Sequence, residues 1–358
     1  MLDNLLSLTG NLIGKVKIMN KSRSVTQQDI ARRLNLSKVS VSKALRDQDD
    51  ISPATKELIR KTAIEMGYMP NLQARNLAEG RSRTLGVVIP KIAHNFFSAV
   101  IESIYTTASA QGYEVVLTIS QEDAEHEKKH FETLMGMRVD GILCSVSEAT
   151  KDTEIFEAVR KRGVPLVFFD RELAGLGFSS VVCNDDKGAY DATTYLIGRG
   201  YKRITHIAGY SETNIGQQRI AGFKRAMADN NLELNEFSII ERGFSEKDGV
   251  AGFEQLAKAP EYPDAIFAVT YPVALGIYSA AREVGLDLPK DIDLICFGAN
   301  ERTKFVTPSI SYIRQPAELM GQRATEVLLQ EIREPALREE HREVLDTELV
   351  PCGDCPDK

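Results

Sequence analysis

VTQQDIARRLNLSKVSVSKAL, residues 25–45, is the stretch that decides the fold, because its spacing predicts two short helices joined by a tight turn. Thr26 can cap the first helix with its hydroxyl oxygen, and Ser37 can cap the second in the same way. Asn35 and Leu36 interrupt the apolar periodicity between the two helices. The side chains expected to face inward are Ile30, Ala31, Leu34, Val41, Ala44 and Leu45. The stretch therefore predicts a helix-turn-helix.

The outer face of the second helix carries mixed chemistry. Lys38, Val39, Ser42 and Lys43 are expected to point away from the small core. Cationic, hydroxyl and small apolar side chains on one helix suit the major groove of DNA. An ordinary surface helical hairpin would show the same inward pattern, so the rest of the chain must decide between the two interpretations.

The charge of the chain is unevenly divided. The formal net charge is -7, yet residues 1–83 hold 15 Lys and Arg against 8 Asp and Glu, a net charge of +7. Residues 84–358 hold 29 against 43, a net charge of -14. A basic segment can neutralise phosphates, whereas an acidic remainder is repelled by nucleic acid. This division favours the DNA-binding interpretation of the helix pair.

A third helix and a linker follow. Ser52 and Pro53 form a helix start, and Gly67 is a typical stop, so residues 24–69 are predicted to be a three-helix head after an N-terminal extension at 1–23. The residues expected to close its core are Ile51, Leu58, Ile59 and Ala63. The linker at residues 70–83 is too short and polar for a stable isolated helix.

The linker nevertheless has a pattern. Ala74, Leu77 and Ala78 have helical spacing, which would place one leucine among small residues on a narrow face, and Arg75 lies nearby for phosphates. Such a segment is suited to gaining its structure in a complex.

From residue 84 onward, apolar strands alternate with amphipathic helices. The expected strands lie at residues 85–90, 115–120, 141–146, 164–170, 180–184, 204–209, 237–240, 265–269 and 293–297. This alternation is typical of parallel sheets covered by helices on both faces. Residues 84–350 are therefore predicted to form an α/β body of two doubly wound parallel-sheet lobes, with ligands bound between them at the C-terminal ends of the strands.

The cysteines and the N-terminus indicate a reduced, cytoplasmic protein. Three cysteines lie in apolar runs, and Cys352-x-x-Cys355 in the tail at residues 351–358 lacks two further ligands for zinc. The N-terminus has neither the charge pattern of a signal peptide nor an unbroken apolar span, so no membrane partner is expected. Met19 leaves open whether residues 1–18 belong to the native chain.

Motifs for enzyme chemistry, a metal or a cofactor are missing. The sequence has no phosphate-binding P-loop, no Gly-x-Gly-x-x-Gly opening a helix after the first body strand, no Gly-x-Ser-x-Gly elbow and no metal-ligand spacing among its five histidines. We expect no catalytic residues, no metal and no cofactor.

Motifs in a fixed order resemble those of the LacI/GalR (lactose-repressor) family of bacterial transcription regulators, over about residues 24–350. They are VTQQDIARRLNLSKVSVSKAL, ISPATKELI with GYMPN, NLQARNLAEGRSRTLGVVIP, HNFFS, RVDGIL, VPLVFFDR, NDDKGA, QQRIAGF, and TPSISYIRQP followed by MG. Each fragment is weak alone, but their order and spacing across head, linker and body are specific.

For the head, the resemblance implies that Lys38, Val39 and Lys43 face base edges in the major groove. The hydroxyl side chains that would serve phosphates or the turn are Thr26, Ser37, Ser40 and Ser42. Lys43 stands where the family often has arginine, and a lysine lacks the planar fork that makes a bidentate contact with guanine.

For the linker, the resemblance implies a hinge helix that orders on operator DNA and enters the minor groove. Leu77 of each subunit would wedge into a central base step, unless it packs on the body instead. The residues expected in the minor groove are Asn71, Ala74, Arg75, Leu77 and Ala78.

For the body, the resemblance to periplasmic sugar-binding proteins implies an effector in the cleft and pairing of the lobes into a dimer. The positions that match effector contacts are Phe96, Phe97, Asp170, Arg219 and Phe244. Of Phe96 and Phe97, one is expected in the core and one facing the ligand. Asp170 has the alternative of pairing with Arg171 or with a backbone amide.

The sequence departs from the family at two places in the cleft. Thr270-Tyr271 replaces Asn-Asp, and Cys296-Phe297-Gly298 replaces Gly-Phe-Asp, so two carboxylates that commonly grip polyol hydroxyls are missing. Tyr271 and Asn300 are expected to take over part of this role. A larger, more apolar or more anionic effector fits as well as a neutral sugar, and a constitutive regulator without effector is also compatible.

The sequence therefore predicts a homodimeric repressor of an operon. It would bind double-stranded, near-palindromic operator DNA through an all-α helix-turn-helix head, under the control of a sugar or sugar derivative in the body. Either sign of response, inducer or corepressor, is compatible. The alternatives are a solute-binding protein or an enzyme on the same α/β scaffold.

Overall fold

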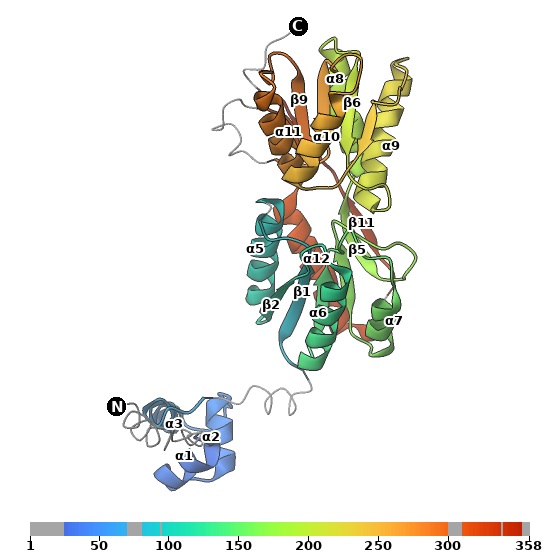
Figure 1. Ribbon diagram of the computed structural model, residues 1–358. Coiled ribbons are helices and arrows are strands. Elements are labelled where there is room, and N and C mark those ends of the chain that lie inside the picture. Colours follow the sequence, from blue (N-terminus) through green and yellow to red (C-terminus); the bar gives the residue numbers. More distant parts are fainter. Residues whose placement is uncertain (1–24, 70–80, 94, 300–309, 338, 353–358) are drawn as a thin grey trace, which may run out of the picture. The chain divides into compact units, whose positions relative to one another are not determined.

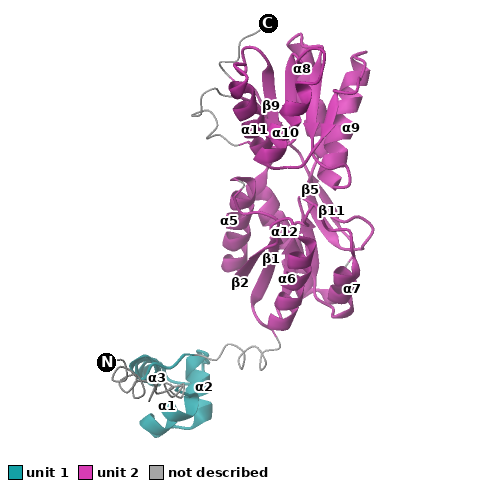
Figure 2. Ribbon diagram, in the orientation of Figure 1, with its two compact units in different colours: residues 1–80 teal, residues 81–358 magenta. Residues whose placement is uncertain are grey.

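The structure is a computed structural model that describes residues 25–69, 81–93, 95–299, 310–337 and 339–352. It contains two compact units, residues 1–80 and residues 81–358, which are coloured separately in Figure 2. Each unit has its own hydrophobic core, and we describe each by itself.

The first unit contains the three predicted head helices, α1 (Gln27–Leu34), α2 (Lys38–Leu45) and α3 (Pro53–Glu65). Their starts follow the sequence signals, because the side chains of Thr26, Ser37 and Ser52 accept hydrogen bonds from backbone amides of the first turns. The fully buried core residues are Ile30, Ala31, Val41, Ala44, Ile59 and Ala63. The expectation for Leu58 was wrong, since 51% of this residue is exposed.

The lower lobe of the body in Figure 1, which we call lobe 1, is built on a six-stranded sheet. Its strand order is β11 (Arg342–Leu345), β5 (Ser179–Cys183), β4 (Leu166–Phe169), β3 (Gly141–Cys144), β1 (Thr84–Ile89) and β2 (Glu114–Ile119), all parallel. Alternate strand residues pack against α5 (Asn95–Ala110) and α12 (Ala317–Arg333) on one face. On the other face they pack against α6 (Ala124–Met137) and α7 (Glu154–Lys161).

The upper lobe, lobe 2, repeats the arrangement (Figure 1). Its strand order is β12 (Glu348–Val350), β10 (Ser311–Arg314), β9 (Asp293–Phe297), β8 (Ala265–Ala268), β6 (Ile204–Ala208) and β7 (Ile239–Glu241), with β12 alone antiparallel to its neighbour. Helices α8 (Asp185–Gly198) and α9 (Asn214–Asp229) cover one face. Helices α10 (Glu246–Leu256) and α11 (Tyr271–Glu283) cover the other.

The chain passes between the lobes three times, from β5 to α8, from β10 to α12 and from β11 to β12. The predicted fold class, a helix-turn-helix head with two doubly wound lobes, is confirmed. All nine predicted strands are present as β1–β9, whereas β10, β11 and β12 were not predicted. Within the described residues, no helix combines the length and apolar character needed to cross a membrane.

Candidate DNA-binding surface and effector pocket

The α2 helix presents the outward face that the sequence predicts. Lys38 is exposed and Val39 is 63% exposed. Both lie in the first turn of the helix, which starts at the Ser37 cap. A solvated aliphatic residue beside a lysine can meet a thymine methyl group while the lysine meets an acceptor.

Lys43 lies one turn further along α2 and is half-buried. Its ammonium group pairs with the carboxylate of Asp50, in the loop between α2 and α3. The hydrogen bond from Lys43 lowers the pKa of Asp50, which keeps this carboxylate ionised. A base edge contacted by Lys43 would therefore share its ammonium group with Asp50 or compete with it.

Most of the hydroxyl groups expected to contact phosphates or stabilise the turn already make hydrogen bonds within the head. Thr26 Oγ1 donates to Asp29 Oδ2 at 2.6 Å while accepting from the Asp29 amide, which is a capping box. Ser37 and Ser40 share a hydrogen bond of 2.8 Å between their hydroxyl oxygens. Ser42 is half-buried on α2. The predicted hinge residues Asn71, Ala74, Arg75, Leu77 and Ala78 lie outside the described residues, as does Asn300.

A cavity of about 170 Å³ lies between the two lobes. Its polar and charged lining residues are Asn95, Asp170, Arg171, Arg219, Thr270 and Gln315. The remaining lining residues are Ala93, Phe96, Phe97, Ile215, Phe244, Tyr271, Pro272, Leu275, Phe297 and Gly298. The cavity therefore brings together all the effector residues predicted from the sequence that the structure describes.

Phe96 and Phe97 begin α5 and have different surroundings. Phe97 is 3% exposed and packs edge-on against Phe169, with ring centroids 6.4 Å apart. Phe96 is only half-buried. Of the two rings, Phe96 is therefore the one with surface left for a ligand to cover.

Arg219 enters the pocket from α9, and most of its donors are used within the protein. Its Nε and Nη2 donate to Asp185 Oδ1 at 2.8 and 2.7 Å, and its Nη1 donates to the Val269 carbonyl at 2.6 Å. The guanidinium carbon lies 3.7 Å from the centroid of the Phe297 ring. Arg219 is thus a neutralised, buried ion pair, rather than a fork open to an anionic ligand.

Asp170 follows β4 with φ +61°, in the left-handed region that non-glycine residues seldom adopt. Its Oδ1 accepts from Gln315 Nε2 at 3.4 Å, and it does not pair with Arg171. Burial raises the pKa of Asp170 to about 6, because little in this site replaces the water that would stabilise its charge. A ligand donor at Asp170 would supply a hydrogen bond that favours the ionised form.

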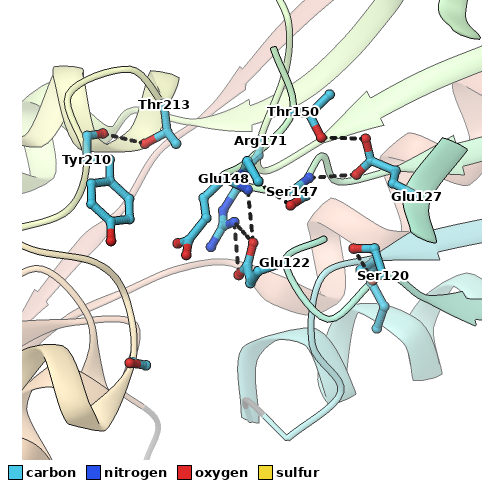
Figure 3. Close-up of polar contacts among 12 residues, drawn as sticks. Ser120, Glu122, Glu127, Ser147, Glu148, Thr150, Arg171, Tyr210 and Thr213 are labelled. Atoms are coloured by element: carbon cyan, nitrogen blue, oxygen red, sulfur yellow. Dashed lines mark hydrogen bonds and ion pairs between the residues drawn. The ribbon is translucent and has the colours of Figure 1, made fainter. Parts of the chain in front are cut away.

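Arg171 also lines the pocket, although the sequence alone indicates no ligand role for it. Its Nη1 donates to both carboxylate oxygens of Glu122, at 2.9 and 3.2 Å, and its guanidinium carbon lies 4.6 Å from the centre of the Phe244 ring. Figure 3 shows this guanidinium beside Glu122, with Glu148 next to it. Burial, together with the charge of Glu122, raises the pKa of Glu148.

The two departures from the family pattern are both at the pocket wall. Thr270 caps α11, where its hydroxyl accepts from the Val273 amide, and Tyr271 begins that helix. Gly298 has φ +81°, and a Cβ atom there would lie 2.7 Å from Gln315 Oε1. Any side chain at position 298, including the aspartate of the family, would therefore require Gln315 to move.

Comparison with known proteins agrees with both units. Residues 26–71 match the model of bacterial regulatory proteins of the lacI family, and residues 193–353 match the periplasmic binding protein-like domain. The transcriptional repressor PurR of Vibrio vulnificus is 32% identical over 310 residues, which is 86% of this chain and 92% of that protein. The chain belongs to the LacI family.

Further relatives support this assignment. The transcriptional repressor CytR of Escherichia coli is 30% identical over 336 residues, covering 94% of this chain and 97% of that protein. The lac repressor dimer bound to operator shares the fold, with a TM-score of 0.80 and 24% identity over 92% of this chain and 98% of that one. This LacI-family protein is therefore a DNA-binding transcriptional repressor with an effector-binding domain, and not an enzyme.

Proposed function

We propose that the protein represses transcription as a cytoplasmic homodimer bound to a near-palindromic operator, and that a small uncharged effector with a ring controls it from the interlobe pocket. Two identical heads on a two-fold axis would present two α2 helices to two half-sites. The exposed Lys38 and Val39 support α2 as the helix that reads bases. In this proposal Leu77 of the hinge wedges into the minor groove.

Exposed apolar residues support dimerisation through the body. Tyr105 on α5 is 54% exposed, and α5 lies on the left of the body in Figure 1. Leu319, 45% exposed, is in the first turn of α12, where the Glu318 carbonyl accepts from Ser103 of α5. A monomeric surface seldom leaves such residues together in contact with water.

The charges of the pocket support an uncharged effector. Of the described lining residues, Arg171 is paired with Glu122 and Arg219 with Asp185, so both cations are already neutralised. Asp170 adds a further acidic group, whose pKa burial raises to about 6. An anionic effector would lose its hydration and meet no unpaired cation among these residues, which argues against the anionic alternative.

The aromatic side chains support a ring in the effector. Phe96 and Tyr271 are both partly exposed at the pocket, Phe96 in lobe 1 and Tyr271 in lobe 2. The flat face of a sugar, a nucleobase or an aryl group can stack on such rings. A hydrogen-bond donor on the effector would reach Asp170, and the solved relative in complex with cellobiose, at 26% identity and a TM-score of 0.70, shows a neutral ligand on this fold.

Thermal unfolding with a panel of compounds tests the effector class. The panel contains neutral sugars, glycosides, nucleobases and nucleosides on one side, and sugar acids and sugar phosphates on the other. A neutral compound at about 100 times its Kd should stabilise the protein by about 2.7 kcal/mol. Phe96→Ala should weaken the binding of that compound. Phe237→Ala should not, because Phe237 is a partly buried residue outside the lining of this pocket. Shifts caused only by the anionic compounds would overturn the proposal.

A further inference from the structure

The segment 170–172, which follows β4 in lobe 1, is held by lobe 2. Asn214, the first residue of α9, donates from Nδ2 to the Asp170 carbonyl at 3.0 Å. Its Oδ1 accepts from the Glu172 amide at 3.3 Å. One side-chain amide thus contacts the backbone on both sides of Arg171, which is the pattern that a neighbouring parallel strand makes with a residue.

The side chain of Arg171 makes a second contact with lobe 2. Its guanidinium lies over the ring of Phe244, at 4.6 Å, while Glu122 holds it from lobe 1. Arg171 is 3% exposed, and its Nε has no hydrogen-bond partner among the described residues. A buried guanidinium with an unused donor costs free energy unless another arrangement supplies a partner.

The loop that supplies Glu122 is strained. Gln121 and Glu122 have φ values of +57° and +63°, and Asp170 on the other side of the contact has +61°. Left-handed backbone at non-glycine residues costs about 1–3 kcal/mol for each residue, so the surroundings must hold these conformations in place. Figure 3 shows the Glu122 carboxylate against Arg171, at the centre of this contact.

The same segment lines the effector pocket. Asp170 and Arg171 are pocket residues, while the backbone of residues 170 and 172 is bound by Asn214. We propose that Asn214 is a positioning residue that clamps segment 170–172 to lobe 2, so that contact of an effector with Asp170 or Arg171 is transmitted to the arrangement of the lobes. This inference rests on the proposed effector site for its regulatory meaning, but the clamp itself can be measured in the free protein.

An exposed ion pair between the lobes is weaker than this contact. Lys151 Nζ and Glu212 Oε1 lie 3.7 Å apart across the cleft, but their side chains are 75% and 68% exposed. An ion pair so exposed contributes little to holding two bodies together. It instead offers two solvent-accessible positions from which the separation of the lobes can be measured.

Hydrogen exchange of the full chain tests the clamp directly. Asn214→Ala removes the partner of the Glu172 amide, so peptides that contain this amide should exchange about tenfold faster. Asn214→Asp keeps an acceptor for that amide and should restore most of the protection. The matched control is Asn230→Ala, at the other end of α9, where the side chain contacts only its own helix, through the Ala226 carbonyl, among the hydrogen bonds described.

Cross-linking measures the consequence for the lobes. Lys151→Cys and Glu212→Cys are combined with Cys352→Ser and Cys355→Ser, which leaves the buried Cys144, Cys183 and Cys296 in place. A short bismaleimide should join the two new thiols rapidly, and Asn214→Ala should slow this reaction several-fold. Asn230→Ala should leave the rate unchanged.

The outcomes distinguish loss of the Asn214 contact from general destabilisation of the protein, and from failure of the proposed effector class. A urea unfolding midpoint close to that of the parent, together with faster local exchange and slower cross-linking, supports the clamp. Unchanged exchange or unchanged cross-linking in Asn214→Ala would overturn it. If Asn214→Ala fails to fold, Asn214→Leu, which also removes both hydrogen-bonding groups, is judged on the same terms. A panel without any binder would contradict the proposed effector class without affecting these measurements.

Discussion

At the scale of single residues, burial decides which charges the body tolerates. His206 on β6 is fully buried, and its ring stacks on Phe267 with centroids 4.3 Å apart. The neutral ring donates from Nδ1 to the Phe267 carbonyl at 2.9 Å. Desolvation lowers the pKa of His206 to about 3, so this side chain stays neutral in the folded protein at any pH where the repressor works.

This burial predicts a pH dependence of stability. The pKa of His206 in the folded protein lies below the unfolded value of about 6.5, so the unfolded chain binds more protons as the pH falls. The contribution of neutral His206 to the free energy of unfolding is therefore fully present above pH 6.5 and is lost as the pH falls towards 3. His206→Phe should therefore reduce the loss of unfolding free energy between pH 7.5 and pH 5.5 by about 1.4 kcal/mol, measured by urea titration. His126→Gln, at an exposed histidine, is the control. An equal loss in the parent and in His206→Phe would contradict the burial argument.

Side chains near the pocket could be predicted from the sequence, but the residues that pair with them could not. The sequence indicates Arg219 as an effector contact. Its guanidinium is instead bound by Asp185, 34 residues away, because α8 packs on α9. Arg171 was considered only beside Asp170, whereas its partner Glu122 is 49 residues away. Local patterns contain no information about such pairings, because the fold creates them.

At the scale of elements, long apolar runs were predictable and short strands were not. Most residues of strands β1–β9 are buried or half-buried, so these strands appear in the sequence as apolar runs. The unpredicted β11 (REVL) and β12 (ELV) have four and three residues and carry charged, exposed side chains. They are edge strands that pair with β5 and β10. Their strand conformation therefore comes from this tertiary pairing rather than from an apolar pattern in their own sequence.

Helices of lobe 2 pack through glycine. A Cβ atom at Gly276 of α11 would lie 2.0 Å from the Glu246 carbonyl oxygen, and one at Gly249 of α10 would lie 2.1 Å from the Val273 carbonyl oxygen. Backbone atoms cannot rotate away as a flexible side chain can. The two helices therefore approach so closely only because both positions lack a side chain.

This packing predicts that a glycine-to-alanine substitution has opposite effects on the free energy of unfolding at two positions. Gly276→Ala should destabilise the body by about 1–3 kcal/mol, since α10 and α11 must separate. Gly136→Ala, in α6 with no atom within 4 Å of the new methyl group, should instead stabilise by about 0.5–1 kcal/mol through helix propensity. Chemical denaturation of both variants measures the difference. Similar free energies of unfolding for the two variants would show that the helices separate at little cost.

At the scale of the whole molecule, the exposed apolar positions predict a dimer interface. A charged side chain introduced at these positions should disrupt it. Tyr105→Asp or Leu319→Asp would place a carboxylate in the proposed interface on α5 or α12. Sedimentation at micromolar concentration should then show monomers, and operator binding should weaken because two heads no longer act together. Leu234→Asp, at a residue of lobe 2 that is 43% exposed and lies outside α5 and α12, should leave the dimer intact. A dimer that survives both interface changes would place the two-fold contact elsewhere.

The three passages of the chain between the lobes also govern how the protein is made. Lobe 1 needs α12 and β11, and lobe 2 needs β10 and β12, although most of each lobe is encoded much earlier. During synthesis, the sheet of each lobe cannot gain its last edge strand until residues near the C-terminus have been made. A premature stop codon before residue 342 would therefore leave both sheets without an edge strand, rather than produce one intact half of a repressor.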